Sequence, residues 1–299
     1  MRGIITARFL LELERRTGCL GCELFDLVVG TSTGGILAAL IASGVPAAQM
    51  MEFYEVDGPR IFKRSLGRAL KTFFSSAGSK YDNQPLIDCL VARIPISRKC
   101  RHARTKFMVP TWDGNKDENL FIKSYDPFWK DFPLAWAAIA TASAPTYFPG
   151  FVPRDERGQP AKYKGYNTRF FDGGFIENNP TTCTLHEIKG QFPQRPVLVV
   201  NFGTGSLTSK VRPAPDGGWA PWALEVYPRM AALQNRLSER TSQRMFEEKS
   251  YYRLDVKLAE PIELDDAREA TLAKMKALAE VAVAENARPF AELAQLLKG

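Results

Sequence analysis

A short serine-centred turn near the start of the chain constrains the fold more than any other feature. Gly30-Thr31-Ser32-Thr33-Gly34 follows the apolar run 24–29 and precedes the small-residue run 36–42. This G-x-S-x-G spacing is typical of a strained turn between a strand and a helix, which exposes the serine hydroxyl. Gly30 and Gly34 are expected because a Cβ there would collide with the neighbouring strand and helix. Five-residue matches also occur by chance, but here the flanking strand and helix both agree, so Ser32 is the candidate nucleophile.

The rest of the chain alternates predicted helices and strands. The continuous apolar run 196–202 is typical of a strand covered on both faces of a parallel sheet. The segment 206–222, with three prolines and two glycines, is predicted to be a loop. We therefore predict a single domain over residues 1–299, of α/β class, in three layers with a central, largely parallel sheet flanked by helices. Helices are predicted at 4–16, 46–56, 85–93, 134–141, 223–249 and 265–297, the last capped by Asp265, and further strands at 106–111, 120–123, 169–172 and 251–258.

Composition narrows the setting of the protein. The net charge of +7 favours anionic partners, either a membrane surface or a nucleic acid. Five cysteines are an odd number, which favours reduced thiols over a disulfide framework. No apolar run approaches the roughly 18 residues of a membrane span, and the first residues lack the apolar centre of a signal peptide. We expect a cytoplasmic or peripheral membrane protein.

A serine nucleophile needs a base, and the chain offers three candidates. His102 lies in a strongly basic segment, which favours a solvated loop, and His186 lies on a predicted helix as an isolated residue. Asp172 ends an apolar strand and is followed by Gly173 and Gly174, which allow another backbone to approach closely. Burial there would raise the pKa of the carboxyl group toward the range that base catalysis needs. An ordinary Asp-Gly-Gly turn stays open as the simpler interpretation.

Three segments together resemble the patatin-like phospholipase family: GTSTGG at 30–35, TASAPTYFPG at 141–150 and FFDGGFIENNP at 170–180. The resemblance implies a lipid acyl hydrolase with a serine and aspartate dyad, which places the serine at Ser32 and the aspartate at Asp172. It also implies that no metal or organic cofactor is needed, and that the substrate is a phospholipid or another lipid ester.

The chain departs from this family at its first residues. The family's oxyanion hole comes from a D-G-G-G-x-R-G loop ahead of the first helix, and only Arg2 and Gly3 match it here. We therefore expect the complete protein to begin further upstream, so that secretion stays an open alternative. Loss of one oxyanion donor costs roughly 100-fold to 1000-fold in turnover in a known case, so weak activity is expected of the chain as it stands.

Two other interpretations stay open. The first is an esterase of the α/β-hydrolase type that uses Ser32, Asp172 and His186, whose chain order matches that fold. Its weakness is that only 31 residues precede Ser32, whereas that fold builds several strands before its nucleophile. The second is a catalytically weak lipid-binding module that has lost its oxyanion loop.

Aromatic and basic residues give a hypothesis for membrane contact. Phenylalanine, tyrosine and tryptophan side chains in 121–136 interleave with lysines, and the segment 98–106 is basic. Core packing explains most of these aromatics equally well. The exposed ones would contact an anionic lipid surface. We expect no nucleic acid partner, and the sequence predicts no oligomeric state.

Overall fold

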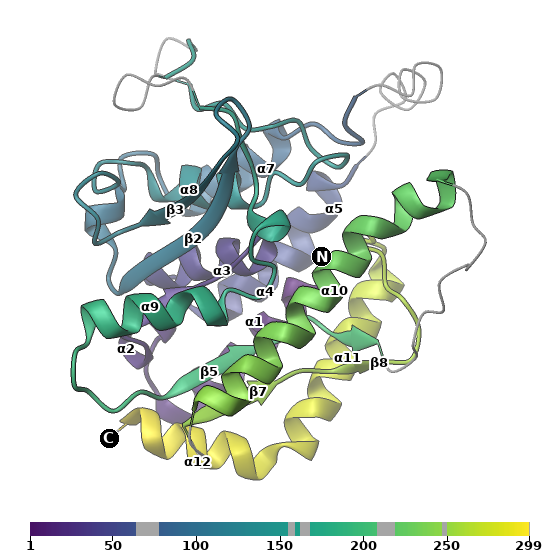
Figure 1. The fold of residues 1–299 in the computed structure, drawn as a ribbon. Helices are drawn as coiled ribbons and strands as arrows, with labels where there is room; N and C mark the ends of the chain where they lie inside the picture. Colours follow the sequence, from purple (N-terminus) through teal and green to yellow (C-terminus); the bar gives the residue numbers. More distant parts are fainter. Residues whose placement is uncertain (64–77, 155–158, 162–167, 208–218, 247–249, 299) are drawn as a thin grey trace.

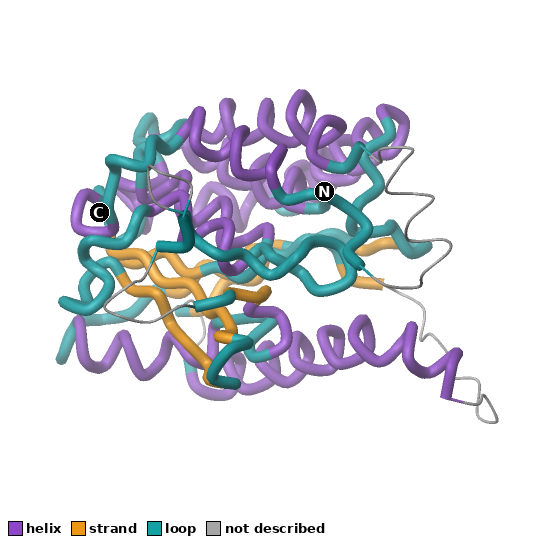
Figure 2. The backbone as a smooth tube through the Cα atoms, turned by 90° about the horizontal axis from the view of Figure 1, so that it is seen from above, coloured by secondary structure: helices purple, strands orange, loops and turns teal. Residues whose placement is uncertain are grey.

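The chain folds into short strands covered by helices on two sides. The computed structural model describes residues 1–63, 78–154, 159–161, 168–207, 219–246 and 250–298. Figure 2 shows the strands in the middle of the molecule, with helices above and below them. The predicted α/β class is therefore confirmed.

The first half of the chain supplies the serine-centred turn and most of the central sheet. Its helices and strands follow the predicted order closely, except that the predicted strand 24–29 is shorter and follows a four-residue helix. Its elements are α1 (Gly3–Thr17), α2 (Gly21–Leu24), β1 (Leu27–Val29), α3 (Thr33–Ala42), α4 (Ala47–Glu52), the π-helix η1 (Phe53–Asp57), α5 (Gly58–Ile61), α7 (Gln84–Arg93), the 3₁₀ helix η2 (Cys100–His102), β2 (Lys106–Asp113), β3 (Glu118–Lys123) and α8 (Leu134–Thr141).

The second half adds the strand that ends at Asp172, two pairs of short strands and the longest helix. Figure 1 shows this long helix, α10, running diagonally across the front of the molecule. The elements are β4 (Phe170–Asp172), the 3₁₀ helix η3 (Gly173–Phe175), α9 (Thr181–Gln191), β5 (Val199–Phe202), β6 (Ser206–Leu207), α10 (Trp219–Met245), β7 (Tyr251–Leu254), β8 (Lys257–Leu258), α11 (Glu269–Glu285) and α12 (Ala287–Lys298).

The sheet is organised around β2. β1 pairs with β2 in parallel, whereas β3 and β4 both pair with it antiparallel. β5 with β7 and β6 with β8 form separate parallel pairs. The four-stranded sheet is therefore mixed, because only the pairing of β1 with β2 is parallel in it. The largely parallel central sheet that we expected is confirmed only in part. The tight hairpin accounts for the β3 pairing, because strands joined by so short a connection must run in opposite directions.

Helix α1 is central to the packing of the helices on one side. Most of its side chains are buried, and it packs against α4, α11 and α12. Gly18 ends the helix in the left-handed conformation, with φ of 74°, which glycine adopts without strain. The beginning and the end of the chain therefore share one hydrophobic core.

Three predictions about helices differ from the structure. The helix predicted at 46–56 changes from α4 to the π-helix η1 at Phe53, and the terminal helix is divided into α11 and α12 at Asn286. Asp265 does not cap α11, because the N-cap of that helix is Arg268. The carboxylate of Asp265 instead accepts a hydrogen bond from Tyr81 at 2.6 Å and pairs with Lys80. Most of the predicted loop 206–222 lies outside the described residues. No helix in the described part of the chain is long and apolar enough to cross a membrane.

Candidate active site

Strands β1 and β4 bring Ser32 and Asp172 together. β3 occupies one edge of β2, and β1 and β4 pair with the other edge while running toward each other. β1 ends with Val29 opposite Met108, and β4 ends with Asp172 opposite Thr111. The chain leaves β1 into the turn that holds Ser32. The two candidate residues therefore lie at strand ends that face each other across a gap in the same edge.

The turn at Ser32 is strained and closely packed. Ser32 has φ of 55° and ψ of −123°, a conformation that non-glycine residues rarely adopt. A Cβ on Gly30 would lie 2.1 Å from the carbonyl oxygen of Gly34, so only glycine fits there. A Cβ on Gly34 would meet nothing within 4 Å. The close packing expected at Gly34 is found instead at Gly35, whose Cβ would lie 2.3 Å from Thr141.

Asp172 is fully buried beside Ser32. Its Oδ1 accepts a hydrogen bond from the Gly174 amide at 2.7 Å, while its Oδ2 has no hydrogen-bond partner in the described structure. Burial raises the pKa of this carboxyl group to about 6, and the Ser32 hydroxyl and the Gly174 amide partly oppose that rise. A Cβ on Gly173 would lie 2.3 Å from the Pro110 carbonyl oxygen, so this glycine lets β4 end tightly against β2. The side chain of Ser32 is thus close enough to Asp172 to affect its ionisation.

Hydrogen bonds hold the surrounding segments in place. The Thr31 hydroxyl donates to the Glu177 carbonyl at 2.6 Å, which joins the serine turn to the segment after β4. The Asp172 amide donates to the Ser143 carbonyl at 3.0 Å. The Ser32 amide donates to the Thr141 hydroxyl at 3.2 Å. The segments 30–35, 141–150 and 170–180 therefore meet at one place.

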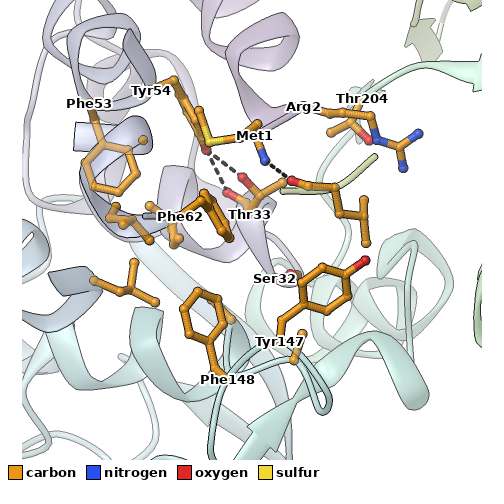
Figure 3. A pocket seen from close by; sticks show the side chains of 17 residues that line it. Met1, Arg2, Ser32, Thr33, Phe53, Tyr54, Phe62, Tyr147, Phe148 and Thr204 are labelled. Atoms are coloured by element: carbon orange, nitrogen blue, oxygen red, sulfur yellow. Dashed lines mark hydrogen bonds between the residues drawn. The ribbon is translucent and has the colours of Figure 1, made fainter. Parts of the chain in front are cut away.

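A cavity of about 110 Å³ opens beside Ser32 (Figure 3). Its wall is largely apolar, and the π-helix η1 and α5 supply much of it. Tyr54 is one of its polar members, and its hydroxyl lies 2.7 Å from that of Thr33. Such a wall favours an apolar group next to the serine. The apolar and aromatic lining comprises Met1, Ile36, Phe53, Tyr54, Ile61, Phe62, Leu86, Ala142, Ala144, Tyr147, Phe148 and Leu264.

The N-termini of α1 and α3 meet at this cavity. A Cβ on Gly3 would lie 2.2 Å from the Tyr54 hydroxyl and 2.5 Å from Thr33 Oγ1. Arg2 lines the cavity, and its Nε is buried without a hydrogen-bond partner in the described structure. First-turn amides of a helix have no partner within the helix, and they carry partial positive charge. The cavity is thus suited to negative charge close to Ser32.

The structure does not bring either histidine to Ser32. His186 is exposed on α9, and His102 is exposed in η2, where its Nδ1 accepts a hydrogen bond from the Lys99 amide at 3.1 Å. Neither belongs to the described lining of the cavity. All five cysteines are free thiols, and the described residues contain no group of three or more histidine, cysteine and acidic side chains able to hold a metal ion.

The sequence marks only some residues of the cavity wall. Thr33 belongs to the G-x-S-x-G turn, and Thr204 lies in a Gly-Thr-Gly run directly after the predicted strand at 196–202. Tyr54 and Leu264 also line the cavity, but they were missed because no local pattern marks them.

A strained serine turn beside a buried aspartate, carried by a mixed α/β fold, is the arrangement expected of a serine hydrolase that lacks a catalytic histidine. The Patatin-like phospholipase family model matches residues 1–184, so this chain belongs to the patatin-like phospholipase family. It is 34% identical over 233 residues to the cGAMP-activated phospholipase of Pseudomonas aeruginosa (strain BWHPSA011 / Pa011), a match that covers 74% of this chain and 65% of that protein.

Two further similarities were found. Patatin-like protein 2 of Oryza sativa subsp. indica is 29% identical over 262 residues, which cover 75% of this chain and 62% of that protein. The structure of VipD from Legionella pneumophila is similar with a TM-score of 0.44 and 12% identity, covering 94% of this chain and 65% of that one. The chain spans less than two thirds of the length of the P. aeruginosa and O. sativa relatives.

Proposed function

We propose that this chain is a lipid acyl hydrolase in which Ser32 is the nucleophile and Asp172 its base. The observation that carries the proposal is the fully buried carboxyl group of Asp172, with its pKa raised to about 6, facing Ser32 beside an apolar cavity. The names of the relatives, which include phospholipases, support a lipid ester as substrate. The substrate class we propose is therefore phospholipids or related lipid esters.

The proposed reaction has two halves and needs no external proton donor. Asp172 takes the proton of the Ser32 hydroxyl as the serine oxygen bonds to the ester carbon, and then gives that proton to the departing alcohol. Water next loses a proton to Asp172 and attacks the acyl group on Ser32. The fatty acid leaves, and the proton returns to Ser32.

The oxyanion of each tetrahedral intermediate needs hydrogen-bond donors. We assign one of them to the amide of Thr33, the first residue of α3, because it follows the nucleophile and has no partner within the helix. Arg2 and Gly3 lie at the start of α1, where Gly3 is next to Thr33 and Arg2 lines the cavity. We propose that they supply the remaining hydrogen-bond donors to the oxyanion.

The experiment is an ester hydrolysis assay with phospholipid, lysophospholipid and neutral ester substrates. Ser32→Ala and Asp172→Asn are each expected to lower kcat by at least about 1000-fold, because either change removes the dyad. Ser97→Ala, an exposed serine, is the matched control and should retain activity. Full activity in the Asp172→Asn variant would refute the dyad. The assay is run with and without cGAMP, because the name of the P. aeruginosa relative states that this nucleotide activates it.

The same assay decides between the rivals. An α/β-hydrolase triad would make His186→Ala inactive, whereas we expect that variant to keep its activity because the imidazole is exposed on α9. A lipid-binding module without catalysis would show no hydrolysis that depends on Ser32.

A further inference from the structure

Helix α10 exposes a row of apolar side chains to the solvent. Leu233 and Leu237 are 59% and 68% exposed, and Met230 and Met245 are also exposed. Met230, Leu233 and Leu237 are spaced by three and four residues, which places them on one face of the helix. Exposed apolar rows of this kind mark interaction surfaces.

The opposite face of α10 fixes the helix against the candidate active site. Ser238 is buried and its hydroxyl donates to the Asn179 carbonyl at 3.1 Å. Gln234 accepts a hydrogen bond from the Asn178 amide at 3.1 Å and donates to the Phe175 carbonyl at 3.3 Å. The exposed row therefore has a set orientation and lies over the segment that follows Asp172.

Three arginines border the apolar row. Arg236, Arg240 and Arg244 are exposed and spaced by four residues. None of them forms an ion pair within the part of the chain that the structure describes. The face thus combines unpaired positive charge with apolar side chains, which complements a surface of anionic head groups over acyl chains.

We propose that this face of α10, made of Met230, Leu233, Arg236, Leu237, Arg240 and Arg244, docks the protein on an anionic phospholipid surface. The inference rests on the proposed function, because an enzyme of membrane lipids must reach its substrate in a bilayer. The aromatic segment 121–136 serves this purpose less well, since Trp129 and Phe132 are buried. The apolar side chains Met230, Leu233 and Leu237 insert between the lipid head groups, while the arginines of the same face pair with the lipid phosphates.

The test is vesicle flotation of the Ser32→Ala variant of the full chain, so that lipids stay intact and binding is independent of turnover. Vesicles of phosphatidylcholine alone are compared with vesicles that also contain phosphatidylglycerol. We expect binding to the anionic vesicles to weaken with salt, and to weaken by about fivefold for each of the three arginines changed to glutamine. Leu233→Asp with Leu237→Asp should weaken it at least about tenfold.

The matched control is Val281→Asp with Leu296→Asp, which changes two exposed apolar residues on α11 and α12. These helices pack on α1 rather than on the segment after Asp172, so vesicle binding should be retained. Unchanged thermal unfolding of both double variants shows that the fold is intact. Wild-type binding in the Leu233/Leu237 variant would overturn the proposal.

A second copy of the chain is the rival occupant of this face. If light scattering shows a dimer that the Leu233/Leu237 variant dissociates, and vesicles are not bound, the docking proposal is refuted. If the Ser32→Ala variant binds vesicles through α10 but the wild-type chain hydrolyses none of the ester substrates, the docking surface is preserved and the proposed function is refuted.

Discussion

The burial of one carboxyl group dominates the chemistry at the scale of single residues. Asp172 has no exposed surface, and this raises its pKa from the usual 3.8 of an aspartate to about 6. A carboxylate with this pKa is a stronger base than an exposed aspartate, and it is still ionised at neutral pH. Asp172 can therefore serve Ser32 without a histidine.

The pKa of Asp172 predicts the pH dependence of the reaction. Only the ionised carboxylate can accept the proton of Ser32, so kcat/KM should fall as the pH drops through about 6 and should level off above it. The measurement is hydrolysis of a soluble ester across this range, with enzyme stability checked at each pH. A flat profile from about pH 5 to about pH 8 would contradict the assignment of this base.

Single residues also show what the sequence could and could not predict. Ser32 could be selected as a candidate because its turn has a local pattern, whereas Asp172 could be selected only with the help of the family resemblance, since Asp-Gly-Gly alone also fits an ordinary turn. The close packing at Gly35 was not found, because it depends on Thr141, which is more than one hundred positions away. A glycine pattern predicts a turn, but it does not reveal which glycine contacts a distant side chain.

Two strand ends set the geometry at the scale of elements. β1 and β4 pair with the same edge of β2, so the β2 backbone fixes the separation of the groups that follow them. The turn after β1 must then be compact enough to fit into the gap. Its glycines should therefore differ sharply in their tolerance to substitution.

Gly30→Ala and Gly34→Ala test this difference. The first change would place a Cβ 2.1 Å from the Gly34 carbonyl oxygen, so we expect destabilisation by more than about 2 kcal/mol and loss of hydrolysis. The second places a Cβ in open space within α3 and should stabilise the protein by about 0.5–1 kcal/mol. Urea unfolding and ester hydrolysis measure both outcomes. Equal behaviour of the two variants would refute the packing argument.

Glu12 is the charged centre of helix α1. It is buried, and it accepts hydrogen bonds from Arg15 at 2.8 Å and Arg16 at 2.7 Å, which with Arg8 hold its pKa at about 2. Because the pKa of Glu12 in the fold is below the usual 4.5 of a glutamate, its stabilising effect is present above about pH 4.5 and is lost as the pH falls through about 2.

Glu12→Gln should therefore lower the free energy of unfolding at neutral pH by about 1–3 kcal/mol, because the partly buried guanidinium groups of Arg8 and Arg16 lose their charged partner. Glu292→Gln on α12 is the matched control, since its pair with Arg288 is exposed and should contribute far less. Urea unfolding at about pH 7 and about pH 3 checks both variants. A loss that is as large at the lower pH would show that the charge of Glu12 is not the cause.

The boundaries of helices and strands show where the periodicity of apolar residues does not predict the structure. The strands predicted at 106–111 and 120–123 are β2 and β3 of an antiparallel hairpin, and the residues Asp113-Gly114-Asn115 between them are a local turn signal. The break between α11 and α12 was not predicted, because the apolar residues continue through Asn286. Asp265 was a plausible cap by composition, but tertiary contacts with Lys80 and Tyr81 use its carboxylate instead.

At the scale of the whole molecule, the C-terminal part completes the site. Thr204 and Leu264 line the cavity, and the Thr6 hydroxyl donates to the Gly203 carbonyl at 2.9 Å. α11 and α12 pack on α1. The segment beyond residue 184, which the family model does not cover, thus shares its core with the segment before it.

This shared core supports the prediction of a single domain over residues 1–299. We expect one cooperative unfolding transition, with equal calorimetric and van't Hoff enthalpies, and we expect a chain that ends at residue 184 to be insoluble. Differential scanning calorimetry and expression of the shorter chain measure these outcomes. Two separate transitions would contradict the prediction.

The overall class was predictable, but the cavity was not. The order of helices and strands follows from local apolar spacing, so the α/β class could be predicted before any coordinates. The cavity is built by a π-helix, two helix N-termini and loops from four regions. Their meeting depends on long-range packing that no short window of sequence contains.

The complete enclosure of Asp172 also affects how the reaction would finish. In the proposed scheme solvent reaches this carboxyl group only past Ser32. The water that hydrolyses the acyl-enzyme must therefore enter through the cavity that the fatty acyl chain occupies. An acyl chain that filled the cavity would exclude this water and slow the hydrolysis of its own ester with Ser32. Short or kinked acyl groups would then be released faster than long straight ones.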